Sequence, residues 1–356
     1  MKKLLLSLLV MSVLVLSVIP GVFATFASSG QVVSITTEDF APEVWQCDDR
    51  VVYDDATEPG RVSGDGINMV ERLNNYAFEG EQIRWKVLVL DKNGIEKVGD
   101  VYMTVDGYKE ANCRLDHVLS AQEQIDSSCN ARILEEELDT PGYENVAAYY
   151  DCLFTVETVE SMYGPADITV EVTDIDTETG AMVEMEHWFL NPNIRLAIEG
   201  DIAFEDVRPG TSAYSDMVKV GNDADADSGV MLDMFISGTD FYDSDNSGAK
   251  CGTSNQLKLG NFAYKATSGA YATKQGVTAD TDVSGYRDIK YGIGFNDPTP
   301  FYYNNEILPA QQVGPYYTAN VLAPGAEMSL TFRLNLPEPC NGDFDKGQIF
   351  FWGEAI

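Results

Sequence analysis

The chain has 356 residues, of which 57 are acidic and only 23 are Lys or Arg, so its formal net charge is −34. A surface of this charge repels nucleic acids and anionic lipids, which excludes both as partners. Hydrophobic residues make up 44% of the chain and aromatic residues 11%, which predicts packed cores rather than disorder. The acidity is explained either by solvation in high salt, where screening weakens self-repulsion, or by bound divalent cations.

The N-terminus has the pattern of an export signal. Lys2 and Lys3 precede an uncharged run over residues 4–19, which Pro20 ends and small residues follow. We expect residues 1–27 to be a cleaved signal peptide, with retention as a membrane anchor as the alternative. No Cys lies near the end of this segment and no apolar tail closes the chain, so no lipid anchor or GPI-type anchor is expected. The mature protein is therefore predicted to be secreted or held at the cell surface.

Alternating polarity predicts β-strands along most of the first half. Residues 82–90 and 98–105 alternate on either side of an Asn-Gly turn, which predicts a β-hairpin. Residues 110–137 place Leu115, Leu119 and other apolar side chains at near-helical spacing, which predicts a short helical insertion. Further strands are expected over residues 149–156, 166–173 and 182–189. This pattern is typical of an immunoglobulin-like β-sandwich.

A second all-β domain is expected after Asn191-Pro192-Asn193, which interrupts the strand pattern and divides residues 28–192 from residues 193–356. Two of its strands are introduced alike, by Pro209-Gly210 and by Pro324-Gly325, each a type II turn signal. The repetition predicts equivalent strands of a sandwich or jelly roll. The expected strands cover residues 194–204, 216–220, 230–236, 257–264, 286–293, 328–336 and 348–352.

Six cysteines in an exported chain predict disulfides. Cys251 and Cys340 lie in the second half and are expected to pair with each other. The four in the first half allow three connectivities, of which we favour Cys113–Cys129, stapling the helical insertion, together with Cys47–Cys152. No two cysteines have the C-x-x-C spacing of redox or metal sites.

The second half resembles the TasA and camelysin-like β-sandwich proteins. The resemblance rests on the signal peptide, Pro209-Gly210, the strand that follows, and Gly221-Asn222-Asp223-Ala224. It implies a jelly roll that builds extracellular fibres. The first half looks similar to the immunoglobulin-like modules of prokaryotic surface proteins.

Acidic turns are the sharpest candidates for a binding site. Two of them read D-x-D-x-S-G, with oxygen ligands at positions 1, 3 and 5 and Gly at position 6, as in short Ca²⁺-binding loops. No Glu stands at position 12, so they are not EF-hands, and Asp-rich loops also form plain turns. A looser relative covers residues 174–180. The candidate ligands are Asp240, Asp243, Asp245 and Ser247, then Asp280, Asp282 and Ser284, then Asp223, Asp225 and Asp227.

Catalytic motifs are absent from the sequence. His117 and His187 are the only histidines, and neither H-E-x-x-H nor G-x-S-x-G occurs, so no enzyme is expected. Aromatic runs at residues 301–305 and 315–317 are expected to pack on a sheet, with sugar binding as the alternative.

The sequence therefore predicts an exported structural or attachment protein of the cell surface or matrix. It would bind itself or other surface proteins, with calcium as a possible cofactor. A calcium-dependent adhesin that binds glycans is the second hypothesis, and a secreted hydrolase is the third.

Overall fold

The computed structural model of the protein describes residues 34–47, 51–53, 74–132, 143–183, 185–276, 280–292, 306–313 and 316–356. Internal contacts divide the chain into two units, Met1–Glu38 and Asp39–Ile356. The predicted signal peptide lies outside the described residues. Among the helices that are described, none is long and apolar enough to cross a membrane.

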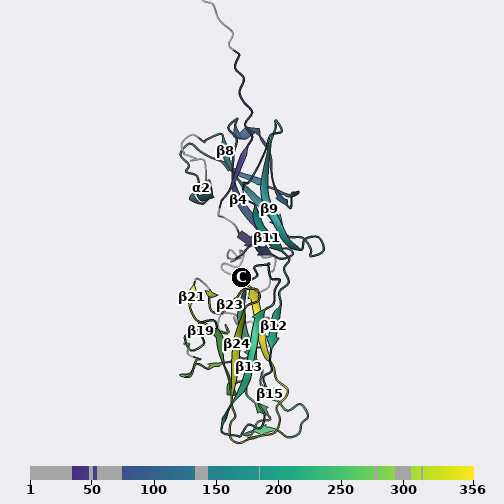
Figure 1. Ribbon diagram of the computed structural model, residues 1–356, viewed down its shortest axis with the longest axis vertical. Helices are drawn as coiled ribbons and strands as arrows, with labels where there is room; N and C mark the ends of the chain where they lie inside the picture. The colour runs from purple at the N-terminus through teal and green to yellow at the C-terminus, as the bar shows by residue number, and fades with distance from the viewer. Residues whose placement is uncertain are drawn as a thin grey trace, which may run out of the picture. The chain divides into compact units, whose positions relative to one another are not determined.

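The fold is almost all β, as predicted, and its sheets pack as sandwiches (Figure 1). Two sheets formed by the chain up to Leu190 enclose a shared apolar core, to which both contribute alternate buried residues. The first sheet has the order β1 (Glu43–Gln46), β4 (Gln82–Leu90), β8 (Ala147–Thr155) and β7 (Arg114–Val118), with β2 (Val51–Tyr53) also paired to β4. The second has the order β3 (Tyr76–Ala77), β11 (Glu186–Leu190), β9 (Gly164–Asp174), β5 (Val98–Val105) and β6 (Tyr108–Asn112), with β10 (Thr179–Ala181) paired to β9.

The predicted hairpin of residues 82–90 and 98–105 is wrong, although both strands form at the expected positions. Strand β4 pairs with β1 and β8, whereas β5 pairs with β6 and β9 in the opposite sheet. The Asn-Gly segment leads into a short 3-10 helix, η1 (Ile95–Lys97), instead of closing a two-residue turn. The carboxylate of Asp91 accepts a hydrogen bond from the N–H of Asn93 (2.8 Å), which holds the chain in this crossing between sheets.

The helix predicted over residues 110–137 is wrong for most of its length. Residues 108–112 and 114–118 form the edge strands β6 and β7, and among the described residues of this segment only α2 (Ser127–Arg132) is helical. Leu115, assigned to the apolar face of a helix, is 47% exposed on β7, and Val118 on the same strand is 39% exposed. Their spacing therefore does not reflect a buried helical stripe.

The favoured cysteine pairing in the first half is also wrong. Cys47 pairs with Cys129, and Cys113 pairs with Cys152. Cys47 follows β1 and Cys129 lies in α2, so the first bond fixes the helix to the sheet. Cys113 lies between β6 and β7, and its bond anchors this crossing to the central strand β8.

A buried carboxylate joins the two sheets of the first sandwich. Glu186 of β11 accepts hydrogen bonds from Gln46 Nε2 (2.7 Å), Trp85 Nε1 (3.0 Å) and Trp188 Nε1 (3.0 Å). The two indole rings meet edge to face, with centroids 5.6 Å apart. One buried acidic side chain thus accepts hydrogen bonds from three donors, two of which come from the opposite sheet.

The strands that follow residue 195 form a second pair of facing sheets. The larger sheet has the order β12 (Leu196–Glu199), β13 (Ser212–Asn222), β24 (Glu327–Asn335), β18 (Phe262–Ser268) and β19 (Tyr271–Ala272), with β20 (Arg287–Asp288) also on β18. The smaller has the order β23 (Val321–Leu322), β14 (Leu232–Gly238) and β26 (Ile349–Ala355). Shorter pairs are β15 (Phe241–Tyr242) with β17 (Gln256–Leu257), β16 (Lys250–Cys251) with β25 (Cys340–Asn341), and β21 (Gln312–Val313) with β22 (Tyr316–Tyr317), and η2 (Leu259–Asn261) is a 3-10 turn.

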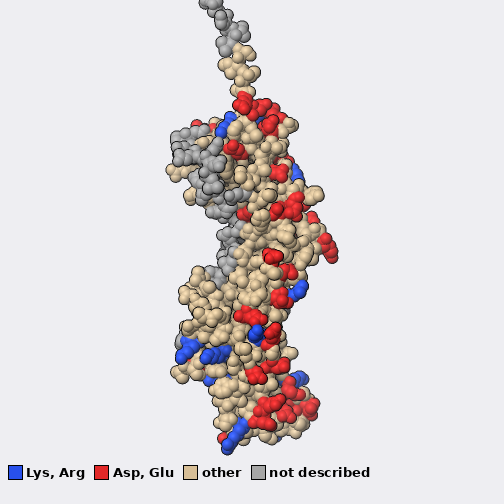
Figure 2. Space-filling view, viewed as in Figure 1, with Lys and Arg blue, Asp and Glu red and all other residues tan. Residues whose placement is uncertain are grey.

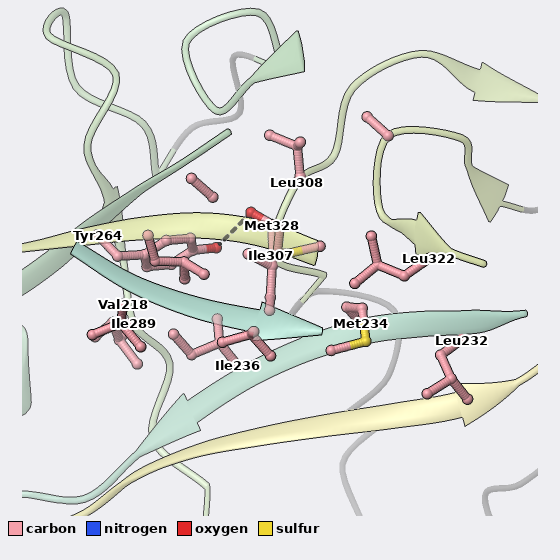
Figure 3. Packing of buried hydrophobic residues seen from close by; sticks show 14 of the residues in the cluster. Val218, Leu232, Met234, Ile236, Tyr264, Ile289, Ile307, Leu308, Leu322 and Met328 are labelled. Atoms are coloured by element: carbon pink, nitrogen blue, oxygen red, sulfur yellow. Dashed lines mark hydrogen bonds between the residues drawn. The ribbon is translucent and has the colours of Figure 1, made fainter. Parts of the chain in front are cut away.

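Apolar side chains of both sheets meet in the second core (Figure 3). Leu232, Met234 and Ile236 project from β14 toward Val218 of β13 and Tyr264 of β18. The hydroxyl of Tyr264 donates a hydrogen bond to the carbonyl of Ile307 (2.9 Å), so the ring's one polar group is satisfied.

The two Pro-Gly turns are related as the sequence predicts. Gly210 and Gly325 have φ of 77° and 76°, the left-handed conformation that a type II turn needs at this position. The strands that they introduce, β13 and β24, pair antiparallel. The N–H of Gly210 donates to the carbonyl of Leu336 (2.9 Å), and that of Gly325 donates to the carbonyl of Asn222 (2.7 Å). Each turn therefore binds the far end of the other strand.

The predicted Cys251–Cys340 disulfide is confirmed, and it joins β16 to β25. The division of the chain at residues 192–193 falls between β11 and β12, and it stays a prediction. Asn222, part of the motif on which the family resemblance rests, has a structural role. Its side chain donates to the carbonyls of Val230 and Leu322 (both 2.8 Å) from a fully buried position.

Candidate functional site

The loop around Asp243 is organised by its first carboxylate. Asp243 Oδ2 accepts hydrogen bonds from Ser247 Oγ (3.0 Å) and from the N–H groups of Gly248 (2.9 Å) and Ala249 (3.1 Å). These bonds, with that from Ala249 foremost, lower the pKa of Asp243 to about 2. Ser247, predicted as a metal ligand, here donates a hydrogen bond from its hydroxyl to the carboxylate. The carboxylate thus acts as the cap of a turn.

The other two candidate ligands of this loop have different surroundings. Asp240 forms an ion pair with Lys258 (2.8 Å) and accepts a hydrogen bond from the N–H of Leu259 (2.9 Å). Asp245 is exposed. The structure adds Asp345, a residue that the sequence did not indicate, because it accepts two hydrogen bonds from Ser244, one of 2.6 Å from its hydroxyl.

Asp282 has the same capping role in the loop of residues 280–285. Its Oδ1 accepts hydrogen bonds from the N–H and hydroxyl of Ser284 (2.9 and 2.7 Å), and its Oδ2 binds Arg333 Nη1 (2.6 Å). Partial burial opposes ionisation, but the bonds from Ser284 and Arg333 outweigh it and keep the pKa of Asp282 well below its usual range. The neighbouring Asp280 forms an ion pair with Lys290 (2.8 Å).

The third loop follows β13. Asp225 accepts hydrogen bonds from the N–H of Asn193 (3.0 Å) and the hydroxyl of Tyr163 (3.1 Å), and the bond from Asn193 lowers its pKa. Asp223 and Asp227, the other candidates, lie on the same loop. Within the described part of the chain, no three His, Cys, Asp or Glu residues are grouped so that they could hold a metal ion. Calcium binding by these loops stays a prediction.

The two histidines lie on different strands, and each contacts carboxylates. His117 Nε2 is 2.6 Å from Glu123, whose hydrogen bond raises the pKa of the imidazole. His187 Nδ1 is 2.5 Å from Asp167 and its side chain is 82% exposed. The absence of enzymatic activity stays a prediction.

The aromatic runs proposed for packing or sugar binding fall largely outside the described residues. This applies to residues 301–305, to Pro315 and to the side chain of Tyr316. Tyr317 is described and is half-buried on β22. Both interpretations of the runs stay predictions.

Strand β12 is an open edge of the larger sheet in the second sandwich. It pairs with β13 on one side, and no described strand pairs with its other side. Ile198 lies opposite the buried Val220 and therefore faces the core side of the sheet, yet it is 53% exposed. The strand contains neither Pro nor Lys, residues that commonly protect such edges. The core of this sandwich is therefore incompletely covered beside β12.

Comparison with known proteins shows no family. No protein-family model matches the chain, and no curated protein matches it. The solved structures that it resembles include the C-terminal domain of the Streptococcus agalactiae antigen I/II polypeptide BspA, with 11% identity and a TM-score of 0.32 over 88% of this chain and 97% of that one. Another is the C-terminal domain of the Streptococcus pyogenes antigen I/II-family protein AspA, with 10% identity and a TM-score of 0.30 over 90% and 97%. A Niemann-Pick type C2 protein from the Japanese carpenter ant covers 42% of this chain and 99% of its own, with 13% identity and a TM-score of 0.17. These likenesses are too distant to support a statement about function, and the resemblance to TasA and camelysin stays a prediction.

Proposed function

We propose that the protein is an exported, non-enzymatic structural or attachment protein of the cell surface or extracellular matrix, which acts by self-association. The observation that carries this proposal is the open edge at β12, with Ile198 half uncovered on its core side. A strand from a second copy can add to such an edge through main-chain hydrogen bonds and cover the exposed apolar side chain. Export and disulfide stapling fit a protein that persists outside the cell.

Charge sets the condition for this assembly. Two copies with a formal net charge of −34 repel each other, so association requires screening by salt or neutralisation by divalent cations. Assembly should therefore increase with ionic strength or with added calcium, and either dependence would explain why the acidity is compatible with self-association.

The test uses the mature chain without residues 1–27, examined by size-exclusion chromatography and electron microscopy in salt, in calcium and in EDTA. The wild type should form oligomers or filaments, and Ile198→Lys should remain monomeric because a lysine at an edge opposes strand addition. The matched control is Val283→Lys, the same change at a loop residue that is 98% exposed. A wild type that is monomeric in every buffer, or an Ile198→Lys variant that assembles normally, would disprove the proposal.

A further inference from the structure

The segment between β7 and α2 lies against the side of the first sheet that faces away from the sandwich core. Leu119 and Ile125 of this segment are only 3% and 6% exposed, and they pack with Leu88 and Leu90 of β4 in an apolar cluster separate from that core. We call residues 119–126 the strap, because they cover these side chains of the sheet.

The strap is fastened at both ends by bonds that do not depend on pH. At one end the N–H of Leu119 donates to the carbonyl of Ala147 (3.0 Å). Just beyond the other end, the disulfide between Cys129 and Cys47 fixes α2. The middle of the strap is held instead by side chains, and these include ionisable groups.

His117 of β7 joins two carboxylates, one of them in the strap. Its Nε2 lies 2.6 Å from Glu123, and its Nδ1 lies 2.9 Å from Asp116 of its own strand. The N–H and the hydroxyl of Ser120 donate to the other oxygen of Glu123 (3.0 and 3.3 Å), which positions that carboxylate. A neutral imidazole has one N–H and can donate to only one carboxylate, whereas the imidazolium donates to both. The geometry therefore fits a protonated ring.

The surroundings of His117 favour the bound proton. The hydrogen bond with Glu123 raises the pKa of the imidazole, that with Asp116 acts in the same direction, and partial burial opposes them. The imidazole also lies 5.2 Å from the ring of Tyr149, whose hydroxyl accepts a hydrogen bond from the N–H of Asp126 in the strap (2.8 Å). The titratable and charged groups on this face are Asp116 of β7, Glu123 and Asp126 of the strap, Tyr149 of β8, and Lys86 of β4, which lies 4.5 Å from the centre of the Tyr149 ring.

The chain contains one other histidine, and it has different surroundings. His187 contacts the carboxylate of Asp167 and its side chain is 82% exposed. Both histidines share the negative field of the whole protein, since Figure 2 shows acidic side chains far outnumbering basic ones on the visible face. The placement between two carboxylates is thus particular to His117, and His187 is a control within the same chain.

We propose that His117 is a pH-sensitive clasp, which holds the strap closed while its imidazole is protonated and loosens it when alkaline solution removes the proton. Deprotonation takes away one of the two donors and the positive charge that attracts both carboxylates. The bonds at the two ends of the strap remain, so the opening is local. It exposes Ile125 and the apolar side chains of β4 beneath it.

The sign of the pH dependence follows from the raised pKa of His117. The clasp contributes fully below the ordinary value of 6.5 and loses its contribution as pH rises through the higher value of the folded protein. Acidic and neutral solution therefore keep the strap closed, and alkaline solution opens it.

Amide hydrogen exchange of the mature chain, followed by NMR, tests the proposal. The exchange rates are expressed as protection factors, which removes the intrinsic pH dependence. From about pH 6 to about pH 9, the protection of the Ser120 and Asp126 amides should fall about fivefold, the effect of losing half-exposed charged contacts. The midpoint should match the titration of the His117 ring, and amides of the central strand β4 should keep their protection. Constant protection of the strap, or a midpoint different from that of His117, would overturn the proposal.

Variants separate the clasp from a merely structural histidine. His117→Gln keeps one donor without the charge, so its strap should be loosened at both pH values, whereas the control His187→Gln should behave as the wild type. Glu123→Gln should shift the titration of the His117 ring to lower pH, because a carboxylate that stabilises the imidazolium is lost. A strap that stays fully protected in His117→Gln at about pH 6, or a His117 titration unchanged by Glu123→Gln, would refute the assignment.

The clasp belongs to the first sandwich and the β12 edge to the second, so the two proposals can fail independently. Ile198→Lys should leave the pH response of the strap unchanged, and a strap that responds to pH in a chain that never assembles would support the clasp and remove self-association. A response that disappears with Ile198→Lys would overturn the assignment to His117.

Discussion

Asp233 is a buried acid whose protonation should control the stability of the second sandwich. It lies on β14, 6% exposed, and accepts a hydrogen bond from the Asn320 amide (2.6 Å). Burial raises its pKa from 3.8 to about 7, the charges of Glu306 and Glu354 act in the same direction, and the bond from Asn320 opposes them. The folded protein therefore holds a proton on Asp233 at pH values where the unfolded chain has lost it.

The sign and size of the effect follow from this difference. Between about pH 4 and pH 7 the folded state binds more protons than the unfolded state, so stability falls as pH rises through this window. Each pH unit between the two pKa values corresponds to about 1.4 kcal/mol, so the ionised Asp233 costs at most about 4 kcal/mol above pH 7. Asp233→Asn keeps the shape and the acceptor oxygen for Asn320 but removes the charge. The variant should exceed the wild type in stability by up to this amount at pH 8, and the difference should vanish near pH 4.

Urea unfolding of both proteins at several pH values between 4 and 8 measures this difference. The control is Asp201→Asn, the same loss of charge at an exposed loop residue, for which the difference should stay small at every pH. A stability difference between Asp233→Asn and wild type that does not change with pH would refute the reasoning.

Three further predictions concern the cores, the disulfides and the loops. Glu186→Ala should lower the free energy of unfolding by at least about 3 kcal/mol, because it removes a buried acceptor of three hydrogen bonds, two of them from the opposite sheet; a smaller loss in urea unfolding would contradict this. Replacing Cys251 and Cys340 with Ser should cost about 4–5 kcal/mol, since the bond closes a loop spanning 89 positions, and an unchanged urea midpoint would contradict this. If the acidic loops bind calcium, the midpoint of thermal unfolding should rise when calcium is added and fall back with EDTA. A midpoint that calcium does not change would show that the folded protein does not bind it.

Strand positions could be predicted from the sequence more reliably than strand partners. Residues 82–90 and 98–105 form strands as expected, because alternation shows which side chains face a core. It does not show which sheet a strand joins, and here the Asn-Gly segment crosses between sheets. The predicted cysteine pairing of the first half was wrong for a similar reason, because cysteine spacing does not determine which strands are neighbours.

The candidate loops could likewise be predicted only where their chemistry is local in sequence. The Asp-rich loops could be recognised because their turn chemistry is local in sequence. Asp345 could not be predicted, since it joins the Asp243 loop from about one hundred positions away. The outward placement of both Tyr214 and Met217 could not be predicted from the sequence either, because the β-bulge between them changes the face to which a strand residue points, and nothing in the local pattern marks it.

The reciprocal hydrogen bonds of the two Pro-Gly turns determine where the sequence of this protein can vary without a change of strand register. Because Gly210 and Gly325 each fasten one end of the β13–β24 ribbon, a slip of one residue would break both bonds at once. The intervening chain, from Asn222 to Leu322, can therefore gain, lose or exchange loop residues while the ribbon keeps its alignment. Mutations that alter the outer surface of β13 and β24 thus act on a frame of constant geometry, so the chemistry displayed there can diverge between relatives without a new fold.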